Sequence, residues 1–202
     1  MKNLLTPQEE LIFKKLNTPV KIQNFLDILP MNFEKQGDTL KSPRFVLKEK
    51  NAHCLEGALL AAAILWYHGQ EPLLLDIQST RDDWDHVVAL FKLGNRWGAI
   101  SKTNHAVLRY REPVYRSYHE LAMSFFHEYF LPENGKKTMR AYSKPFNLKK
   151  MGTDWVTASN DLWKLSGKLD NSPHIKVLTP KMLRFLRKAN RIEIKAAKIP
   201  EW

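Results

Sequence analysis

The sequence predicts an α+β fold in which an apolar helix packs on one face of an antiparallel sheet. Residues 51–65 form a run rich in Ala and Leu, which have high helix propensity. Three short apolar runs follow at 72–77, 86–91 and 96–101, and polar turn residues separate them. Such spacing is typical of neighbouring strands in a meander. A helix followed by a meander is expected to bury its apolar side against the sheet.

Two helices are expected before the central one. Thr6-Pro7-Gln8-Glu9 supplies an N-cap, a proline at the first helical position and a glutamate at the third. We expect this helix to run to about residue 16 and to bury Leu11, Ile12 and Leu16. Thr18-Pro19 repeats the start signal, and Pro30 should stop the second helix. Residues 31–50 predict a loop with one short extended or helical piece.

The central helix carries Cys54, the only cysteine of the 202 residues, in its expected first turn. Asn51 is a good N-cap residue, and Gly69 is a natural stop signal. A thiol at this position lies near the positive end of the helix dipole and near N–H groups without intrahelical partners, which lowers its pKa. The alternative is that Cys54 is a small buried hydrophobic residue.

Charge divides the chain at about residue 135. The net charge is +11, and residues 136–202 carry 16 Lys/Arg against 5 Asp/Glu, whereas the two signs balance in residues 1–135. We therefore expect a core over residues 1–135, with a helix opened by Ser117, and a basic, partly helical extension over 136–202, with a helix at about 181–198. Clustered Lys and Arg could contact nucleic acid or another anionic surface, although no nucleic-acid-binding motif is present.

The compartment follows from cysteine usage and hydropathy. A single cysteine cannot form an internal disulfide, which fits a reducing compartment. The longest apolar run, residues 58–67, is far too short for a transmembrane helix, and the first residues lack a signal-peptide pattern. We expect a cytoplasmic protein without a transmembrane segment.

A thiol nucleophile needs an imidazole that takes its proton and later protonates the leaving group. His86 opens the second expected strand, 32 residues after Cys54. A helix, a strand and a turn fit between the two residues, so the strand can pass beside the start of the helix. The acidic turn at 82–85 would help to hold a positive imidazolium.

Together, Cys54, Gly69, His86, Trp97-Gly98 and the turn into Ser101 resemble the transglutaminase-like superfamily, which shares its core with papain-like cysteine proteases. The resemblance covers roughly residues 40–105 and implies such a core over about 18–135. It also implies a nucleophilic Cys, a His, and an Asp after the Trp-containing strand. This chain has Ser101 at the Asp position, and Asn104 is the other candidate to orient His86. Neither residue brings a negative charge.

Five further residues are candidates for substrate binding, each with a plainer alternative: His53, Glu56, Trp84, Trp97 and His105. His53 adjoins Cys54 but is not expected to face the same way, and Glu56 could simply complement the helix dipole. The tryptophans could belong to the core, and His105 lies in a polar loop. Cys54, His86, His105 and an Asp could be written as zinc ligands, but no close-spaced ligand pair is present, so we expect no metal and no cofactor.

These observations favour a cysteine-dependent acyl-transfer enzyme, either a peptidase or amidase or a transglutaminase-type transferase, acting on a peptide or protein amide. Helix-start N–H groups around Cys54 would hold the oxyanion. The alternative is a binding module that has kept the fold and lost catalysis, because the third site residue is not a carboxylate. In that case residues 136–202 would contact an acidic partner.

Overall fold

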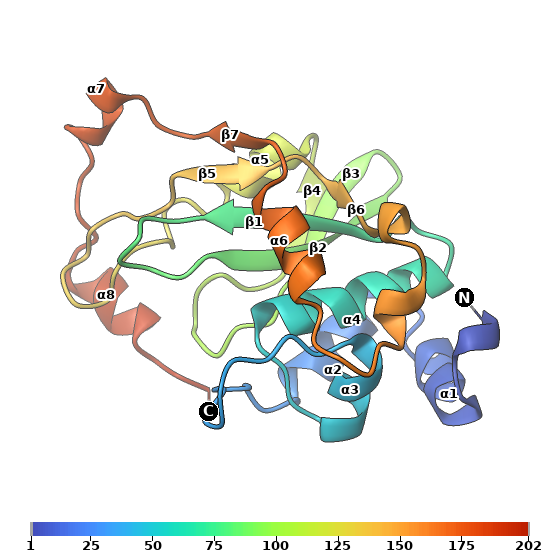
Figure 1. Ribbon diagram of the computed structural model, residues 1–202. Coiled ribbons are helices and arrows are strands. Elements are labelled where there is room, and N and C mark those ends of the chain that lie inside the picture. Colours follow the sequence, from blue (N-terminus) through green and yellow to red (C-terminus); the bar gives the residue numbers. More distant parts are fainter. Residues whose placement is uncertain (1, 202) are drawn as a thin grey trace.

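The computed structural model describes residues 2–201, and it has the α+β architecture that the sequence predicts (Figure 1). Seven strands form one sheet in the order β4-β3-β2-β1-β5-β7, and the short β6 also pairs with β1. All the strand pairs are antiparallel. The strands are β1 (Leu73–Gln78), β2 (His86–Leu93), β3 (Arg96–Ile100), β4 (Arg111–Tyr115), β5 (Ala141–Ser143), β6 (Phe146–Asn147) and β7 (His174–Lys176).

The predicted meander is β1, β2 and β3. Leu93 pairs with Arg96, so β2 and β3 are joined by the two-residue turn Gly94-Asn95. Gly94 has a φ of +56°, a left-handed conformation that costs glycine little. Strand β4 is not among the strands expected from the sequence; it joins the edge of the sheet beside β3.

The central helix α4 (Cys54–Tyr67) is buried on almost every side, between the sheet and the helices α2 (Pro19–Asp27) and α3 (Pro43–Glu49) (Figure 1). The prediction of Asn51 as its N-cap is wrong, because His53 is the N-cap and forms a capping box with Glu56. Gly69 ends the helix with a φ of +88°, as predicted. Its N–H donates to the carbonyl of Trp66.

The first helix, α1 (Pro7–Lys15), has the predicted capping box between Thr6 and Glu9. The prediction that Leu11 is buried is wrong, since Leu11 is 54% exposed. Ile12 and Leu16 are half-buried. The helix packs through Phe13 and through Glu9, whose carboxylate forms an ion pair with Arg44 on α3, so the inward stripe is rotated from the predicted one.

Apolar cores lie on both faces of the sheet. One core joins α4 and its neighbouring helices to the side chains of Leu74, Ala89 and Ile100. The other packs α5 (Tyr118–Met123) and the residues after it against Leu75, Val88 and Ala99. The alternation along each strand divides the two sets. The helix predicted from Ser117 begins there but ends at Met123, earlier than expected.

Residues 136–202 contribute to the same sheet as the rest of the chain, since they supply β5, β6 and β7. They also form α6 (Trp163–Asp170), which passes in front of β1 and β2 (Figure 1). The single helix predicted at 181–198 is wrong: α7 (Pro180–Leu183) and α8 (Arg191–Ala197) are separated by seven non-helical residues. The short 3-10 helices are η1 (Lys2–Leu4), η2 (Leu148–Met151) and η3 (Asp154–Val156).

Over residues 2–201, the helices are all too short or too polar to cross a lipid bilayer.

Candidate active site

Cys54 is the first residue of α4 and lies on a cavity of about 980 Å3. Strands β1 and β2 line it through Asp76 and Val87, and the segment after β3 lines it from residue 102 to 108. Helix α6 closes another side with Trp163 and Asp170. Segments that are more than 100 residues apart in the sequence therefore meet around one thiol.

The surroundings of Cys54 stabilise its thiolate. Burial raises the pKa of the thiol, but hydrogen bonds from the imidazoles of His53 and His86, and their positive charges, outweigh burial and lower the pKa to about 5. The first turn of α4 adds the positive end of the helix dipole. This lowered pKa favours the thiolate at neutral pH, the form of cysteine that acts as a nucleophile.

His53 lies in the site, although its position next to Cys54 argued against this in sequence. Its Nε2 is 3.1 Å from the carbonyl oxygen of Thr39, so Nε2 carries a proton, and Nδ1 accepts the N–H of Leu55 at 3.3 Å as the N-cap of α4. Burial lowers the pKa of His53, but its hydrogen bond to Cys54 and the negative charges of Cys54 and Glu56 raise it to about 9. Cys54 and His53 thus favour each other's charged form.

Glu56 is fully buried and does not line the cavity. It holds the backbone of His53 in place through a hydrogen bond. Its Oε2 accepts the N–H of His53 at 3.0 Å, and its Oε1 accepts the Oγ1 proton of Thr39 at 2.8 Å and the N–H of Lys41 at 3.0 Å. Asn32 also donates to it. One carboxylate therefore fixes the segment 32–41 against the start of α4.

His86 is held by Ser101, one of the two residues predicted to orient it. Nε2 of His86 lies 2.8 Å from Oγ of Ser101, and this Oγ lies 2.6 Å from the carbonyl oxygen of Leu108. The Ser101 proton goes to that carbonyl, so Ser101 accepts the Nε2 proton, and Nδ1 is left as the basic nitrogen. Gln23 clamps the Ser101 backbone through both its N–H and its carbonyl oxygen, at 2.9 and 2.8 Å.

Asn104, the other candidate, and His105 also line the cavity, in the loop that follows Ser101. The backbone carbonyl of Asn104 accepts the N–H of Glu201 at 2.8 Å, and His105 pairs with Pro200. Arg109 forms an ion pair with Glu201 at 2.6 Å. The C-terminal segment thus holds this loop in place. Among the described residues, no contact links the side chain of Asn104 to His86.

The two tryptophans predicted beside the site lie in different places. Trp84 lines the cavity and is 89% exposed, whereas tryptophan side chains are on average highly buried. Trp97 packs edge-to-face against Tyr118 in the core on the face of the sheet remote from α4, and it does not contribute to the cavity wall. The placement of Trp97 corrects its assignment to the cleft.

Sequence reasoning missed Asp76, which lies in the cavity wall, and its partner His174. Oδ2 of Asp76 is 2.9 Å from Nε2 of His174, across 98 residues of sequence. Burial raises the pKa of Asp76 to about 6, although the hydrogen bond from His174 opposes this, and the charges of Asp85 and Asp170 add to it. No spacing in the sequence signals this pair, because the two residues lie on β1 and β7, which are far apart in the sequence and are separated by β5 in the sheet.

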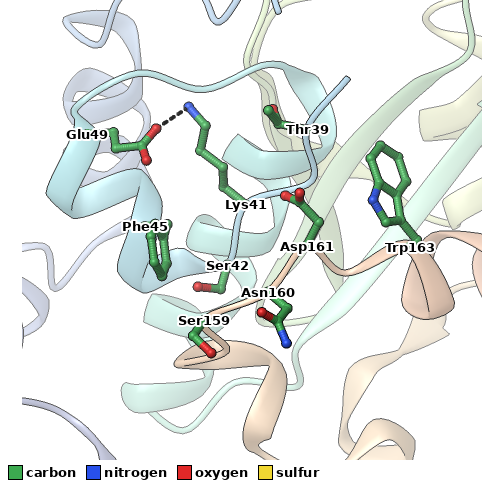
Figure 2. Close-up of a pocket in the computed structure, with 9 residues that line it drawn as sticks. All are labelled: Thr39, Lys41, Ser42, Phe45, Glu49, Ser159, Asn160, Asp161 and Trp163. Atoms are coloured by element: carbon green, nitrogen blue, oxygen red, sulfur yellow. Dashed lines mark ion pairs between the residues drawn. The ribbon is translucent and has the colours of Figure 1, made fainter. Parts of the chain in front are cut away.

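A second cavity, of about 490 Å3, is lined by residues of segment 39–42, of α3 and of 159–163 (Figure 2). Lys41 points to Glu49 there, with the two charges 3.0 Å apart. The Leu40 N–H donates to Asp161 at 2.8 Å, and the Ser42 hydroxyl donates to the Ala158 carbonyl at 2.7 Å. These contacts tie residues 158–161 to the site and place the start of α6 over the first cavity.

Within residues 2–201, no group of three or more His, Cys, Asp or Glu side chains is arranged to hold a metal ion. Comparison with known proteins finds no family model that matches the chain and no match among curated proteins.

Proposed function

We propose that the chain is a cysteine-dependent acyl-transfer enzyme with a transglutaminase-like or papain-like core. The observation that carries the proposal is the position of Cys54, which begins a helix between two imidazoles and faces a large cavity. A structural cysteine needs neither the imidazoles nor access to a cavity. The hydrogen bonds from His86 to Ser101 and from Ser101 to Leu108 further support the proposal, because they fix the tautomer of His86, the proposed base.

In the proposed reaction, the Cys54 thiolate attacks the carbonyl carbon of an amide and forms a C–S bond. N–H groups in the first turn of α4 stabilise the oxyanion. His86, in its protonated form, gives its proton to the leaving amine as the C–N bond breaks. Water or an amine then attacks the thioester and gives a proton to His86, and the C–S bond breaks to restore the thiolate.

The alternative, a binding module without catalysis, is favoured by one observation: Ser101 stands where a carboxylate would stabilise imidazolium. Glu56 partly compensates for the missing carboxylate, since it places a buried negative charge 3.6 Å from the other imidazole, His53. The thiolate is therefore supported by charge on the His53 side and by orientation on the His86 side.

The test is the pH dependence of alkylation by iodoacetamide, which reports on Cys54 alone because the sequence has one cysteine. We expect fast alkylation down to about pH 5, well below the reference thiol pKa of about 8.5. His86→Ala should shift this profile to higher pH, whereas the control His127→Ala, which removes an exposed imidazole, should not. An inert thiol, or identical profiles for His86→Ala and the unmodified chain, would refute the proposal.

A further inference from the structure

The charge around Cys54 is opposite to that of the chain as a whole. The chain has a net charge of +11, yet nine of the residues that line the cavity are Asp or Glu and one, Lys102, is a Lys or Arg. Lys102 is fully buried, and its ammonium donates to the carbonyl of Leu29 at 2.5 Å. The cavity is therefore a negative recess in a positive molecule.

Some of these carboxylates are neutralised within the protein. Asp82 forms an ion pair with Lys136 at 2.8 Å, and Glu128 forms one with Arg111 at 2.7 Å. These two pairs are structural, because they tie the cavity wall to neighbouring segments. Two more face histidines, since Nε2 of His174 is 2.9 Å from Asp76 and Nε2 of His53 is 3.9 Å from Glu34. Five of the nine lining carboxylates remain without a basic partner in the part of the chain that the structure describes: Asp38, Asp83, Asp85, Glu133 and Asp170.

Three of these carboxylates are hydrogen-bonded to neutral donors. Asp83 is hydrogen-bonded to the Thr138 hydroxyl and the Trp84 N–H, and Asp85 to the N–H and hydroxyl of Ser79, all of them neutral donors. Asp170 bonds to the hydroxyl of Ser166. In the part of the chain that the structure describes, none of the three forms a salt bridge.

Some of the carboxylates in the cavity wall repel one another, and this repulsion affects their pKa values. Burial is the main factor that raises the pKa of Asp170, and the charge of Asp85 adds to it. The charges of Asp85 and Asp170 likewise add to the effect of burial on Asp76. A cation bound among these carboxylates would relieve the repulsion between them.

Trp84 gives a second, independent indication of the ligand. Its indole is 89% exposed on the same wall, between Asp83 and Asp85 in the chain, and Tyr129 holds its backbone by donating a hydroxyl proton to the Trp84 carbonyl. An exposed indole beside carboxylates, on a backbone that is held in place, is a favourable surface for an ammonium or guanidinium group, through cation–π attraction.

We infer that the cleft of this enzyme selects a substrate with a cationic side chain, the ammonium of lysine or the guanidinium of arginine, which binds at Trp84, Asp85 and Asp170. The inference rests on the proposed function for its chemistry, but the charge preference of the cavity is measurable without turnover. The cationic side chain belongs to the acyl donor, so that the scissile carbonyl is presented to Cys54 from the same cavity.

Charged thiol reagents measure the preference directly, with Cys54 as the reporter. The probes are methanethiosulfonates with a trimethylammonium, a neutral methyl or a sulfonate group. Each forms an S–S bond to Cys54 as methanesulfinate leaves. Relative to their rates with free mercaptoethanol, we expect the cationic reagent to react about tenfold faster than the anionic one at low salt, and the ratio to shrink at high salt, where the Debye length falls to a few Å.

The variant Asp85→Asn/Asp170→Asn should lower this cation-to-anion ratio at least about threefold, since two charges leave the cavity. The matched control Glu112→Gln/Asp154→Asn removes two exposed charges that lie outside the cavity and should keep the ratio. A ratio equal to that of free mercaptoethanol, or one that the two double variants change equally, would overturn the inference.

A second arm assigns the cation to the donor. Fluorogenic coumarin amides with Arg, Gln or Glu before the scissile bond are compared, with and without methylamine. We expect kcat/KM for Arg to exceed that for Glu at least about tenfold, a difference of about 1.4 kcal/mol. Acceleration by methylamine without a preference among the donors would place the cation on the acceptor and contradict the assignment. No turnover of any amide together with a strong charge preference would refute the proposed function and leave the preference of the cleft for cations standing.

Discussion

The Nε2 of His86 lies 2.8 Å from the Oγ of Ser101, and the proton of this hydroxyl goes to the Leu108 carbonyl oxygen, 2.6 Å away. A hydroxyl can accept from an imidazole N–H and donate to a carbonyl at the same time. An ionised carboxylate can only accept. The environment of residue 101 is therefore built for serine rather than for the Asp that the family resemblance implies.

Ser101→Asp should accordingly lower the free energy of unfolding instead of improving the site. The new carboxylate would face the Leu108 carbonyl without a proton to donate, in a position that is 1% exposed. We expect a loss of about 2–4 kcal/mol at pH 7, measured by urea denaturation. Ser159→Asp, at an exposed serine, is the control and should change stability little.

Ser101→Ala tests the orienting role separately. It removes the acceptor for the Nε2 proton of His86 and leaves the imidazole free to rotate or change tautomer. A hydrogen bond of about 0.5–1.5 kcal/mol predicts a roughly twofold to tenfold slower alkylation of Cys54 near pH 6. An unchanged rate in Ser101→Ala would show that Ser101 does not position His86.

Much of this site follows from sequence, and the part that does not depends on distant chain. Cys54 and His86 could be found because the thiol begins a strong helix signal and the imidazole begins an apolar strand. The choice between Ser101 and Asn104 could not be made, because it depends on how the loop after β3 bends back toward Leu108. The sheet of the C-terminal third was missed since its strands have three residues or fewer.

His53 shows a different limit of sequence reasoning. Adjacent residues in a regular helix cannot face the same way, which is why His53 was separated from Cys54. His53 is in fact the N-cap, with extended backbone at φ −89° and ψ −176°, so its ring turns back over the helix start. The signal that could have revealed it was the Glu three residues later, which forms a capping box with His53 as it does with a Ser or Thr N-cap.

Gly57 is where α4 approaches the loop that carries Ser101. A Cβ built on Gly57 would lie 2.6 Å from Cβ of Lys102, the residue after Ser101. Gly57→Ala should therefore push the loop away from the helix, lower the free energy of unfolding by about 1–3 kcal/mol, and slow the alkylation of Cys54 near pH 6. Urea denaturation and iodoacetamide kinetics measure the two effects.

The control for Gly57 is Gly167, a glycine in α6 whose added Cβ would meet no atom within 4 Å. Gly167→Ala should raise the free energy of unfolding by up to about 1 kcal/mol, because alanine has the higher helix propensity. It should also leave alkylation unchanged. Stabilisation by both substitutions would show that α4 and the loop have room to spare.

Glu56→Gln should lower both the stability of the fold and the pKa of His53. Burial raises the pKa of Glu56, but the charge of His53 and the N–H groups of Lys41 and His53 outweigh it and hold the pKa below its usual value. A neutral amide would turn its NH2 group toward one set of these donors. We expect a loss of about 2–4 kcal/mol at pH 7, measured by urea denaturation.

The pH dependence of Glu56 has a definite sign. A carboxyl whose pKa is lower in the folded chain stabilises it above the unfolded pKa of about 4.3, and this stability is lost as pH falls through the folded value. The unmodified chain should therefore lose stability more steeply than Glu56→Gln below about pH 4.3. Glu112→Gln, at an exposed residue, should follow the unmodified chain.

Asp76→Asn should have the opposite pH signature. Burial is the largest factor that raises the pKa of Asp76 to about 6, so between the unfolded value of 3.8 and about 6 the folded chain binds more protons than the unfolded chain. This contribution to stability is present below pH 3.8 and is lost as pH rises through about 6.

An asparagine cannot titrate, and its amide can still donate to Nε2 of His174, whose Nδ1 proton goes to the Ser172 carbonyl at 2.6 Å. From pH 4 to pH 7, the free energy of unfolding should thus fall by about 1–3 kcal/mol less in Asp76→Asn than in the unmodified chain. Urea denaturation at both pH values measures the difference, with the exposed Asp154→Asn as the control. Equal pH dependence in all three proteins would mean that Asp76 is ionised throughout this range, and that the negative charge of the cavity is larger still.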